Sequence, residues 1–220
     1  MAAKMIAFDS RKEWLEHRKN GLGGSDIAAV IGENPWMSNS ELWEIKTGRR
    51  QQADIGDKEF VQYGHSAEEH IRELFRLDHP ELIVRYADFN SWTNDRYPWA
   101  VASLDGWTGD VINNRKGVLE IKTTEIQRST DWEKWDGGIP QQYYSQVLFY
   151  MAVTEADYAD LRAAIRYTAR EGDKRTTIRD YHIERSEVEE DIRYLMNAGE
   201  AFWTHNVLEN RRPALILPEI

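Results

Sequence analysis

The segment GVLEIKTT, residues 117–124, constrains the fold more than any other, because it has the apolar composition of a buried β-strand and yet carries two charges. Successive side chains of a strand point to opposite faces, so Glu120 and Lys122 share one face, roughly 7 Å apart along the chain. Leu119 and Ile121 share the other face. Burying a charge is costly unless it is paired or bound to a metal. The strand therefore predicts either a Glu120–Lys122 ion pair or a polar site beside the core.

The composition indicates a soluble globular protein. Any metal that it binds must be held without cysteine ligands. With 220 residues, 41% hydrophobic content and nine Trp, the chain is long enough to bury a substantial core. We expect a cytoplasmic location, since no apolar run approaches the ~20 residues that span a bilayer and the first residues lack a secretory signal. The absence of Cys excludes disulfides and thiolate metal sites, so Asp, Glu, His and carbonyl oxygen remain, which favours Mg²⁺ or Mn²⁺. The net charge of −10 argues against a basic nucleic-acid-binding surface over the whole chain.

The predicted elements run from helices to strands and then alternate. Capping-box spacings at Ser10 and Ser38 start two helices, and a third begins near Gly24 or Ser25 and ends at Gly32. The periodicity predicts further helices over about 58–77, 140–153 and 186–208, and strands over 82–89, 97–105, 117–124, 158–168 and 176–184. This order indicates an α/β (α+β) fold in a single domain, 1–220, with a helical part over about 1–78 and a sheet-containing core over about 79–220.

Three acidic residues and one lysine stand out by position. Glu68 lies inside the long predicted helix, Asp105 lies in the turn-like ASLDGW, and Glu120 and Lys122 share the charged face of the core strand. If the strands before and after the NNRKG loop pair, the carboxylates of Asp105 and Glu120 can reach one point. Mg²⁺ prefers such carboxylates together with a backbone carbonyl and waters, and the water that it polarises can attack phosphorus.

The order of Asp105, Glu120 and Lys122 resembles the PD-(D/E)xK nuclease pattern, with Leu104 at the position of the leading proline. More closely, the chain resembles the lambda exonuclease and YqaJ-like phage recombinase family over about residues 10–155. The matching features, in order, are Arg18 with Ser25, the G-x-x-x-E of Gly64 to Glu68, the turn Ser103 to Gly106, the E-x-K of Glu120 to Lys122, and the Y-x-x-Q of Tyr143 to Gln146. The hairpin loop before Glu120 is longer than usual, and Glu69 stands where the family often has Pro.

The resemblance implies a restriction-endonuclease-like core, a central mixed sheet flanked by helices. It implies a metal-dependent 5′-to-3′ exonuclease on double-stranded DNA ends, in phage-type recombination. It further implies a trimeric ring and a partner recombinase that anneals single strands. The implied site consists of the metal ligands Glu68, Asp105, Glu120 and the carbonyl of Ile121, the catalytic Lys122 and Gln146, and the phosphate- or DNA-binding Arg18, Ser25 and Tyr143.

Other functions fit the same residues. A nuclease of this fold could have the opposite polarity or cut internally, and a DNA-end-binding module could keep the fold without catalysis. The intact set of Asp105, Glu120 and Lys122 argues against the module.

Simpler structural interpretations apply to several residues taken alone. Gln146 could be a hydrogen-bonded core glutamine, and Ser25 could only cap its helix while Arg18 forms a surface ion pair. His65 and His70, five residues apart, fall on different helix faces and are interpreted as structural or surface residues. The Trp pair 132 and 135 could stack on a base or anchor a loop in the core.

Overall fold

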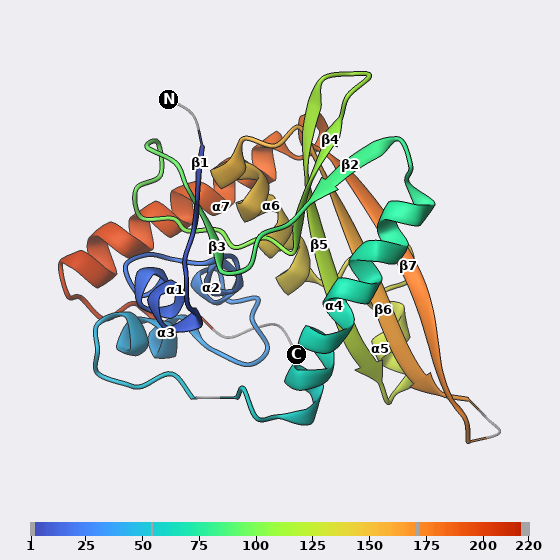
Figure 1. The fold of residues 1–220 in the computed structure, drawn as a ribbon. Helices are drawn as coiled ribbons and strands as arrows, with labels where there is room; N and C mark the ends of the chain where they lie inside the picture. Colours follow the sequence, from blue (N-terminus) through green and yellow to red (C-terminus); the bar gives the residue numbers. More distant parts are fainter. Residues whose placement is uncertain (1–2, 54, 170–171, 217–220) are drawn as a thin grey trace.

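The computed structural model describes residues 3–53, 55–169 and 172–216. Figure 1 shows a twisted sheet with helices on both faces and a group of short helices beside it. The elements in chain order are β1 (Lys4–Ala7), α1 (Arg11–Arg18), α2 (Gly24–Val30), α3 (Asn39–Lys46), α4 (Glu59–Asp78), β2 (Leu82–Arg85), β3 (Asn90–Thr93), β4 (Gly106–Asp110), β5 (Arg115–Ile126), α5 (Ser129–Glu133), α6 (Gln141–Thr154), β6 (Tyr158–Thr168), β7 (Lys174–Glu184) and α7 (Glu189–Ala201). A π-helical segment, Phe202–Leu208, extends α7.

The central sheet has five strands in the order β2-β4-β5-β6-β7. Strands β5 and β6 run parallel, because α6 carries the chain back across the sheet between them, and the other neighbouring pairs are antiparallel. This arrangement confirms the expected mixed sheet flanked by helices. A separate two-stranded sheet pairs β1 with β3, which the sequence pattern did not predict.

The two faces of β5 are covered by different helices. Leu119 and Ile121 pack against Phe75 of α4 in a small apolar cluster. The opposite face carries Val118, which packs in the main core with α6. Helix α4 crosses one side of the sheet and α6 lies on the other (Figure 1). The predicted alternation along residues 117–124 is therefore confirmed, and the charged face of β5 points toward α6.

The helix starts follow the capping signals. The Ser10 and Ser38 side chains accept hydrogen bonds from the backbone N–H groups of Glu13 and Glu41, as expected. Helix α2 begins at Gly24, and its N-cap is Gly23, whose N–H donates to the Asp26 carboxylate at 2.8 Å. The Asp26 side chain thus provides one hydrogen bond of a capping box. Of the two predicted starts, Gly24 and Ser25, the structure has Gly24.

The predicted strand over 97–105 is wrong. Within it the structure has only two isolated bridges, from Ala100 to Leu22 and from Ala102 to Trp92. A turn closes where the N–H of Ala100 donates to the carbonyl of Tyr97, and the strand begins only at Gly106. The alternating pattern of this segment reflects side chains buried in the core, among them Trp99 and Ala102.

No helix in the described part of the chain is both long enough and apolar enough to cross a membrane.

Candidate active site

Glu120 and Lys122 form one side of a closed polar triad with Gln146. Glu120 is only 1% exposed, and its Oε1 lies 2.6 Å from Nζ of Lys122. Gln146, on α6, bridges the pair: its Nε2 donates to Glu120 Oε1 at 2.8 Å, and its Oε1 accepts from Lys122 Nζ at 3.1 Å. The same Nε2 also donates to the Tyr150 hydroxyl at 2.9 Å. The predicted ion pair exists, and α6 fixes its orientation.

The second carboxylate oxygen of Glu120 has no partner. Oε2 is buried and accepts no hydrogen bond from any residue that the structure describes. Leaving a buried carboxylate oxygen unsatisfied costs about 1–3 kcal/mol or more, so an ordered water or a bound ion is expected at this atom. The free lone pairs of Oε2 are an acceptor that a cation can use.

Asp105 lies in a turn that several side chains hold in place. Its Oδ2 accepts from the backbone N–H of Ile121 at 2.9 Å, which ties the turn to β5. The buried amide of Asn90 makes both backbone hydrogen bonds of Leu104, donating to its carbonyl at 2.8 Å and accepting from its N–H at 2.9 Å. The indole N–H of Trp14 donates to the Ser103 hydroxyl at 3.1 Å. Asp105 is thus placed immediately before β4, beside the charged face of β5.

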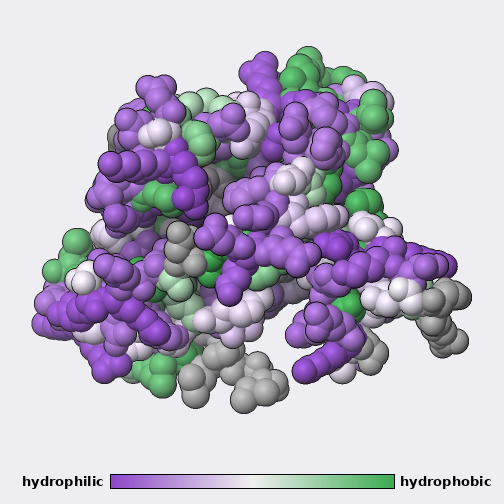
Figure 2. Space-filling view, turned by 60° about the horizontal axis from the view of Figure 1, so that its bottom comes forward, coloured by the Kyte–Doolittle hydropathy of each residue, from purple (hydrophilic) through white to green (hydrophobic). Residues whose placement is uncertain are grey.

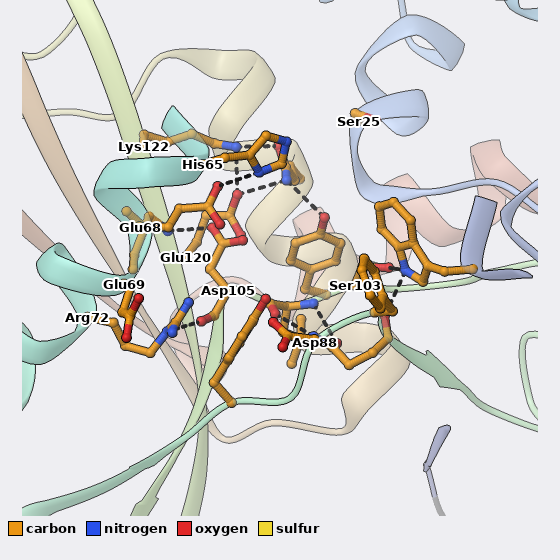
Figure 3. A pocket seen from close by; sticks show the side chains of 18 of the residues that line it. Ser25, His65, Glu68, Glu69, Arg72, Asp88, Ser103, Asp105, Glu120 and Lys122 are labelled. Atoms are coloured by element: carbon orange, nitrogen blue, oxygen red, sulfur yellow. Dashed lines mark hydrogen bonds and ion pairs between the residues drawn. The ribbon is translucent and has the colours of Figure 1, made fainter. Parts of the chain in front are cut away.

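Helix α4 brings Glu68 to the same place. In Figure 3 the side chains of Glu68, Asp105 and Glu120 point toward one another. Arg72, one helical turn after Glu68, donates from Nε to the backbone carbonyl of Asp105 at 2.7 Å. Of the neighbouring acids Glu68 and Glu69, Glu68 is the more buried.

The electrostatics indicate too little positive charge for three carboxylates. Burial, and then the charge of Asp105, raises the pKa of Glu68 to about 7, and the same two causes raise the pKa of Glu120 to about 8. Burial also raises the pKa of Asp105. Burial lowers the pKa of Lys122, but the charges of Glu120 and Asp105 outweigh it and raise that pKa overall. Lys122 is therefore an ammonium cation at neutral pH.

These residues fit a hard divalent cation by chemistry. Within the described ranges no three His, Asp or Glu side chains already form a metal-binding cluster. The donor set is nevertheless all oxygen, one carboxylate oxygen is unsatisfied, and each carboxyl group has a raised pKa that an added positive charge would lower. The predicted ligands are Glu68, Asp105, Glu120 and the carbonyl of Ile121, and metal binding by them stays a prediction.

One cleft of about 730 Å³ contains most of the predicted site. The predicted residues that line it are Arg18, Ser25, Glu68, Asp105, Glu120, Ile121, Lys122 and Gln146. Tyr143 is not part of the lining; its ring lies 4.9 Å from Lys122 Nζ and 5.8 Å from the ring of Trp135. The face shown in Figure 2 is predominantly hydrophilic.

Arg18 and Ser25 approach the cleft from α1 and α2. The Arg18 guanidinium lies over the ring of Trp14 at 4.5 Å, and Ser25 is exposed across the cleft from the carboxylates (Figure 3). Trp14 also donates to the carbonyl of Asn90 at 3.0 Å, so α1 is fastened to the segment that holds Asp105. Residues far apart in sequence therefore converge on one concave surface.

Four further residues were missed by sequence reasoning: Arg72, Asn90, Trp14 and Tyr150. Arg72 follows Glu68 by four residues, which places both on one face of α4, and this spacing is a signal that could have identified it.

Of the Trp pair, Trp135 is 3% exposed, so its ring anchors the loop in the core. The side chain of Trp132 is half-buried and packs edge-on against Tyr167. The exposed His65 is at the rim, with Nδ1 4.0 Å from Glu68 Oε1.

Comparisons with known proteins agree with this fold and identify a family. Residues 13–157 match the model of the YqaJ-like viral recombinase domain family. The uncharacterized protein YqaJ of Bacillus subtilis (strain 168) is 29% identical over 212 residues, which cover 94% of this chain and 59% of that protein. The chain thus spans 59% of the length of this curated relative.

Two solved structures share the fold. The alkaline exonuclease LHK-Exo from Laribacter hongkongensis superimposes with a TM-score of 0.61 at 21% identity, covering 91% of this chain and 96% of that one. A phage related exonuclease from Haemophilus somnus 129PT gives a TM-score of 0.54 at 12% identity, covering 86% and 96%. Since the family model covers more than half of the residues, the chain belongs to the YqaJ-like viral recombinase domain family.

Proposed function

We propose that the chain is a divalent-metal-dependent nuclease that degrades double-stranded DNA from its ends, in the 5′-to-3′ direction. The observation that carries the proposal is the unsatisfied Oε2 of Glu120 beside Asp105 and Glu68, with an ammonium group fixed on the same strand. Family membership and the fold shared with two exonucleases support it. LHK-Exo has also been solved in complex with dAMP, a deoxynucleoside monophosphate.

The residues of the cleft would have two roles, metal binding and stabilisation of negative charge. Glu68, Asp105, Glu120 and the Ile121 carbonyl would hold Mg²⁺ or Mn²⁺. When bound, such a cation supplies a water of lowered pKa and neutralises charge on the phosphate. Lys122, held by Glu120 and Gln146, presents its positive charge toward the phosphoryl oxygens and the attacking hydroxide.

Gln146 keeps the Lys122 ammonium and the Glu120 carboxylate in one fixed geometry. Each of its two polar atoms is bonded to one member of the pair, so neither side chain can rotate away without breaking a buried hydrogen bond. The chain therefore contributes a preorganised cation and an acceptor that is already directed at the site.

Arg18 and Ser25 are the residues on which the proposed 5′-to-3′ direction of digestion rests. A guanidinium fork and an exposed hydroxyl match the geometry of a phosphate, and both line the cleft that holds the carboxylates. In this proposal they bind the terminal 5′-phosphate while the scissile phosphodiester lies near Lys122. Tyr143 would support the DNA-binding side from beneath Lys122.

The setting that we propose is recombination of the phage type. The relevant assembly would be a homotrimeric ring that encloses duplex DNA, and the partner would be a recombinase that anneals the single strand left by digestion. Both follow from the family resemblance. Sedimentation of the purified protein and a pull-down with a candidate annealing protein would test them.

One experiment tests activity, polarity and end dependence together. Linear duplex DNA labelled at either the 5′ or the 3′ end is digested with Mg²⁺ and with excess chelator. We expect early release of the 5′ label as mononucleotide, only with Mg²⁺, and no cutting of closed circles. Early release of the 3′ label would indicate the opposite polarity, and cutting of circles would indicate an endonuclease. Binding of ends without cleavage in Mg²⁺ or Mn²⁺ would indicate a non-catalytic module.

A further inference from the structure

Arg72 is a buried cation that lines the cleft of the candidate site. The residue is 5% exposed, and its guanidinium stacks on the ring of Tyr86 at 3.6 Å. Its Nε donates to the carbonyl of Asp105, and Figure 3 shows the side chain directed at that residue. Burying a guanidinium is costly unless it is paired and hydrogen-bonded, so its position among the carboxylates requires an explanation.

A second arginine on the same helix shows what is particular to Arg72. Arg76, four residues later, also donates from its guanidinium to a backbone carbonyl, that of Val84 in β2, at 3.3 and 3.0 Å. Arg76 forms a surface ion pair with Glu73 and does not line the cleft. Both arginines fasten α4 to the chain beside it, but only Arg72 fastens it to a residue of the site.

The turn at Asp105 is held from three directions. Asn90 fixes Leu104, the N–H of Ile121 fixes the Asp105 carboxylate, and Arg72 fixes the Asp105 carbonyl. Arg72 is the only one of these three that comes from α4, the helix that carries Glu68. The distance between Glu68 and Asp105 therefore depends on this hydrogen bond. The charge of Arg72 also lowers the pKa of both carboxyls, against the burial that raises it.

We propose that Arg72 is a positioning residue, which sets the placement of the Glu68 and Asp105 carboxylates by holding the Asp105 carbonyl from α4. It acts through Asp105 and does not contact the DNA. The inference rests on the proposed function. Tyr86 assists, because its ring stacks against the guanidinium plane and so helps to keep Nε directed at the carbonyl.

The test compares Arg72→Lys and Tyr86→Leu with Arg76→Lys as a matched control on the same helix. Three quantities are measured: amide hydrogen exchange at Ile121 without metal, with Val118 as an internal reference; Mg²⁺ affinity by calorimetry; and kcat and KM on linear duplex. We expect Arg72→Lys to accelerate exchange at Ile121 and to weaken Mg²⁺ binding by about 10–100-fold. For Arg72→Lys at low Mg²⁺, we expect kcat to fall by about the same factor as the Mg²⁺ affinity, and saturating Mg²⁺ should restore part of it. KM for DNA should change by less than about twofold.

Tyr86→Leu should change the same quantities in the same direction by less, and Arg76→Lys should change none of them. A raised KM for DNA with unchanged Mg²⁺ affinity would overturn the inference, because Arg72 would then contact DNA. Unchanged exchange at Ile121 would overturn it as well. If Arg72→Lys does not fold, Tyr86→Leu decides: weaker Mg²⁺ binding at constant KM supports the inference, and unchanged binding overturns it.

Failure of the proposed function is a separate outcome. A parent protein that cleaves no DNA and binds no Mg²⁺ would refute the nuclease. The Ile121 exchange, which requires neither metal nor DNA, would still show whether Arg72 holds the Asp105 turn.

Discussion

Gly24 lies directly against the ring of Tyr150: a Cβ at Gly24 would lie 2.4 Å from Cε1 of Tyr150 and 2.9 Å from Cγ of Gln146. Helix α2, which carries Ser25, thus packs without any intervening side chain on Tyr150 and Gln146 of α6. These two residues are hydrogen-bonded to each other, and Gln146 is also hydrogen-bonded to Glu120. The candidate phosphate-binding end of the cleft and the carboxylate end are joined at this contact.

Gly24→Ala should therefore impair both stability and cleavage. The added methyl group must displace the Tyr150 ring or the Gln146 side chain, and overpacking of this kind costs about 1–3 kcal/mol. We expect a lower free energy of unfolding and reduced turnover on linear duplex, measured by urea denaturation and by the labelled-end digest. Gly138→Ala is the matched control, since a Cβ there meets nothing within 4 Å. Parental activity in a folded Gly24→Ala variant would contradict the proposed coupling of the two ends.

Lys122→Ala and Glu120→Gln should each abolish cleavage while the fold persists. Gln is isosteric with Glu, and both side chains lie at a polar site, so neither change opens a cavity in the apolar core. Loss of the fixed cation or of a metal ligand should lower turnover by about 10³-fold or more. Turnover and a thermal melt are measured together, with Glu125→Gln, an exposed acid on the same strand, as the control. Full activity in either variant would remove β5 from the catalytic site.

Ca²⁺ should bind the cleft and support little cleavage. The predicted ligands are all oxygen and suit either ion, but Ca²⁺ has looser and larger coordination than Mg²⁺ and positions the attacking water less well. We expect calorimetry to detect Ca²⁺ binding and the digest to show inhibition when Ca²⁺ competes with Mg²⁺. Equal rates with the two ions, or activity in excess chelator, would refute the all-oxygen metal site.

The side-chain directions along β5 were predictable because they follow from the covalent geometry of a strand. A period of two puts Glu120 and Lys122 on one face wherever the strand lies, and only the identity of the covering helix had to come from the structure. The capping residues Ser10 and Ser38 were predictable for the same reason, since a cap is a local hydrogen bond within one turn.

The environment of Asp105 was not predictable from local pattern. Arg72, which donates to the Asp105 carbonyl, is 33 residues away in sequence. Every residue has a backbone carbonyl, so the residue type at 105 does not indicate this hydrogen bond. The segment before Asp105 has the pattern of a strand but is not one. At Leu104 the side-chain amide of Asn90 makes the backbone hydrogen bonds that a neighbouring strand would otherwise make. Which group makes these hydrogen bonds is decided by tertiary packing and not by the local pattern.

His182 should make stability depend on pH near neutrality. Burial lowers its pKa, but hydrogen bonds to Glu184 and Asp160 outweigh burial and raise the pKa above 6.5, with Nδ1 2.7 Å from Asp160 Oδ1 and Nε2 3.0 Å from Glu184 Oε1. A raised pKa in the folded state means that the stabilisation is fully present below the unfolded-state pKa and is lost as pH rises through the folded-state pKa.

His182→Gln should therefore destabilise the protein more at about pH 6 than at about pH 9. The difference should stay below about 1 kcal/mol, because the side chain is 50% exposed and solvent screens its ion pairs. Urea denaturation of parent and variant at both pH values measures it. The parent must keep the same m-value at the two pH values for the comparison to hold. An equal loss of stability at both values would show that the charge of His182 contributes nothing.

Duplexes with a 5′-phosphate should be degraded much faster than those with a 5′-hydroxyl, and Arg18→Ala should remove most of that preference. The Arg18 guanidinium is held over Trp14, and it lines the same cleft as Ser25 and the carboxylates. A charge-assisted, forked contact to phosphate is the interaction that a neutral hydroxyl end cannot make. The variant should keep its Mg²⁺ dependence, because Arg18 touches none of the predicted metal ligands.

Lys19→Ala is the matched control for that comparison. Lys19 is the exposed neighbour of Arg18, and its charge is engaged by Glu16 at 2.6 Å, so its removal changes the net charge equally without reaching the cleft. Rates on the two substrates are compared for parent, Arg18→Ala and Lys19→Ala at one ionic strength, since salt alters all phosphate contacts. A preference that survives in Lys19→Ala and disappears in Arg18→Ala assigns the terminal phosphate to Arg18. A parent that is indifferent to the 5′ group would exclude both Arg18 and Ser25 from such a pocket, and the polarity of digestion would then have to come from another part of the cleft.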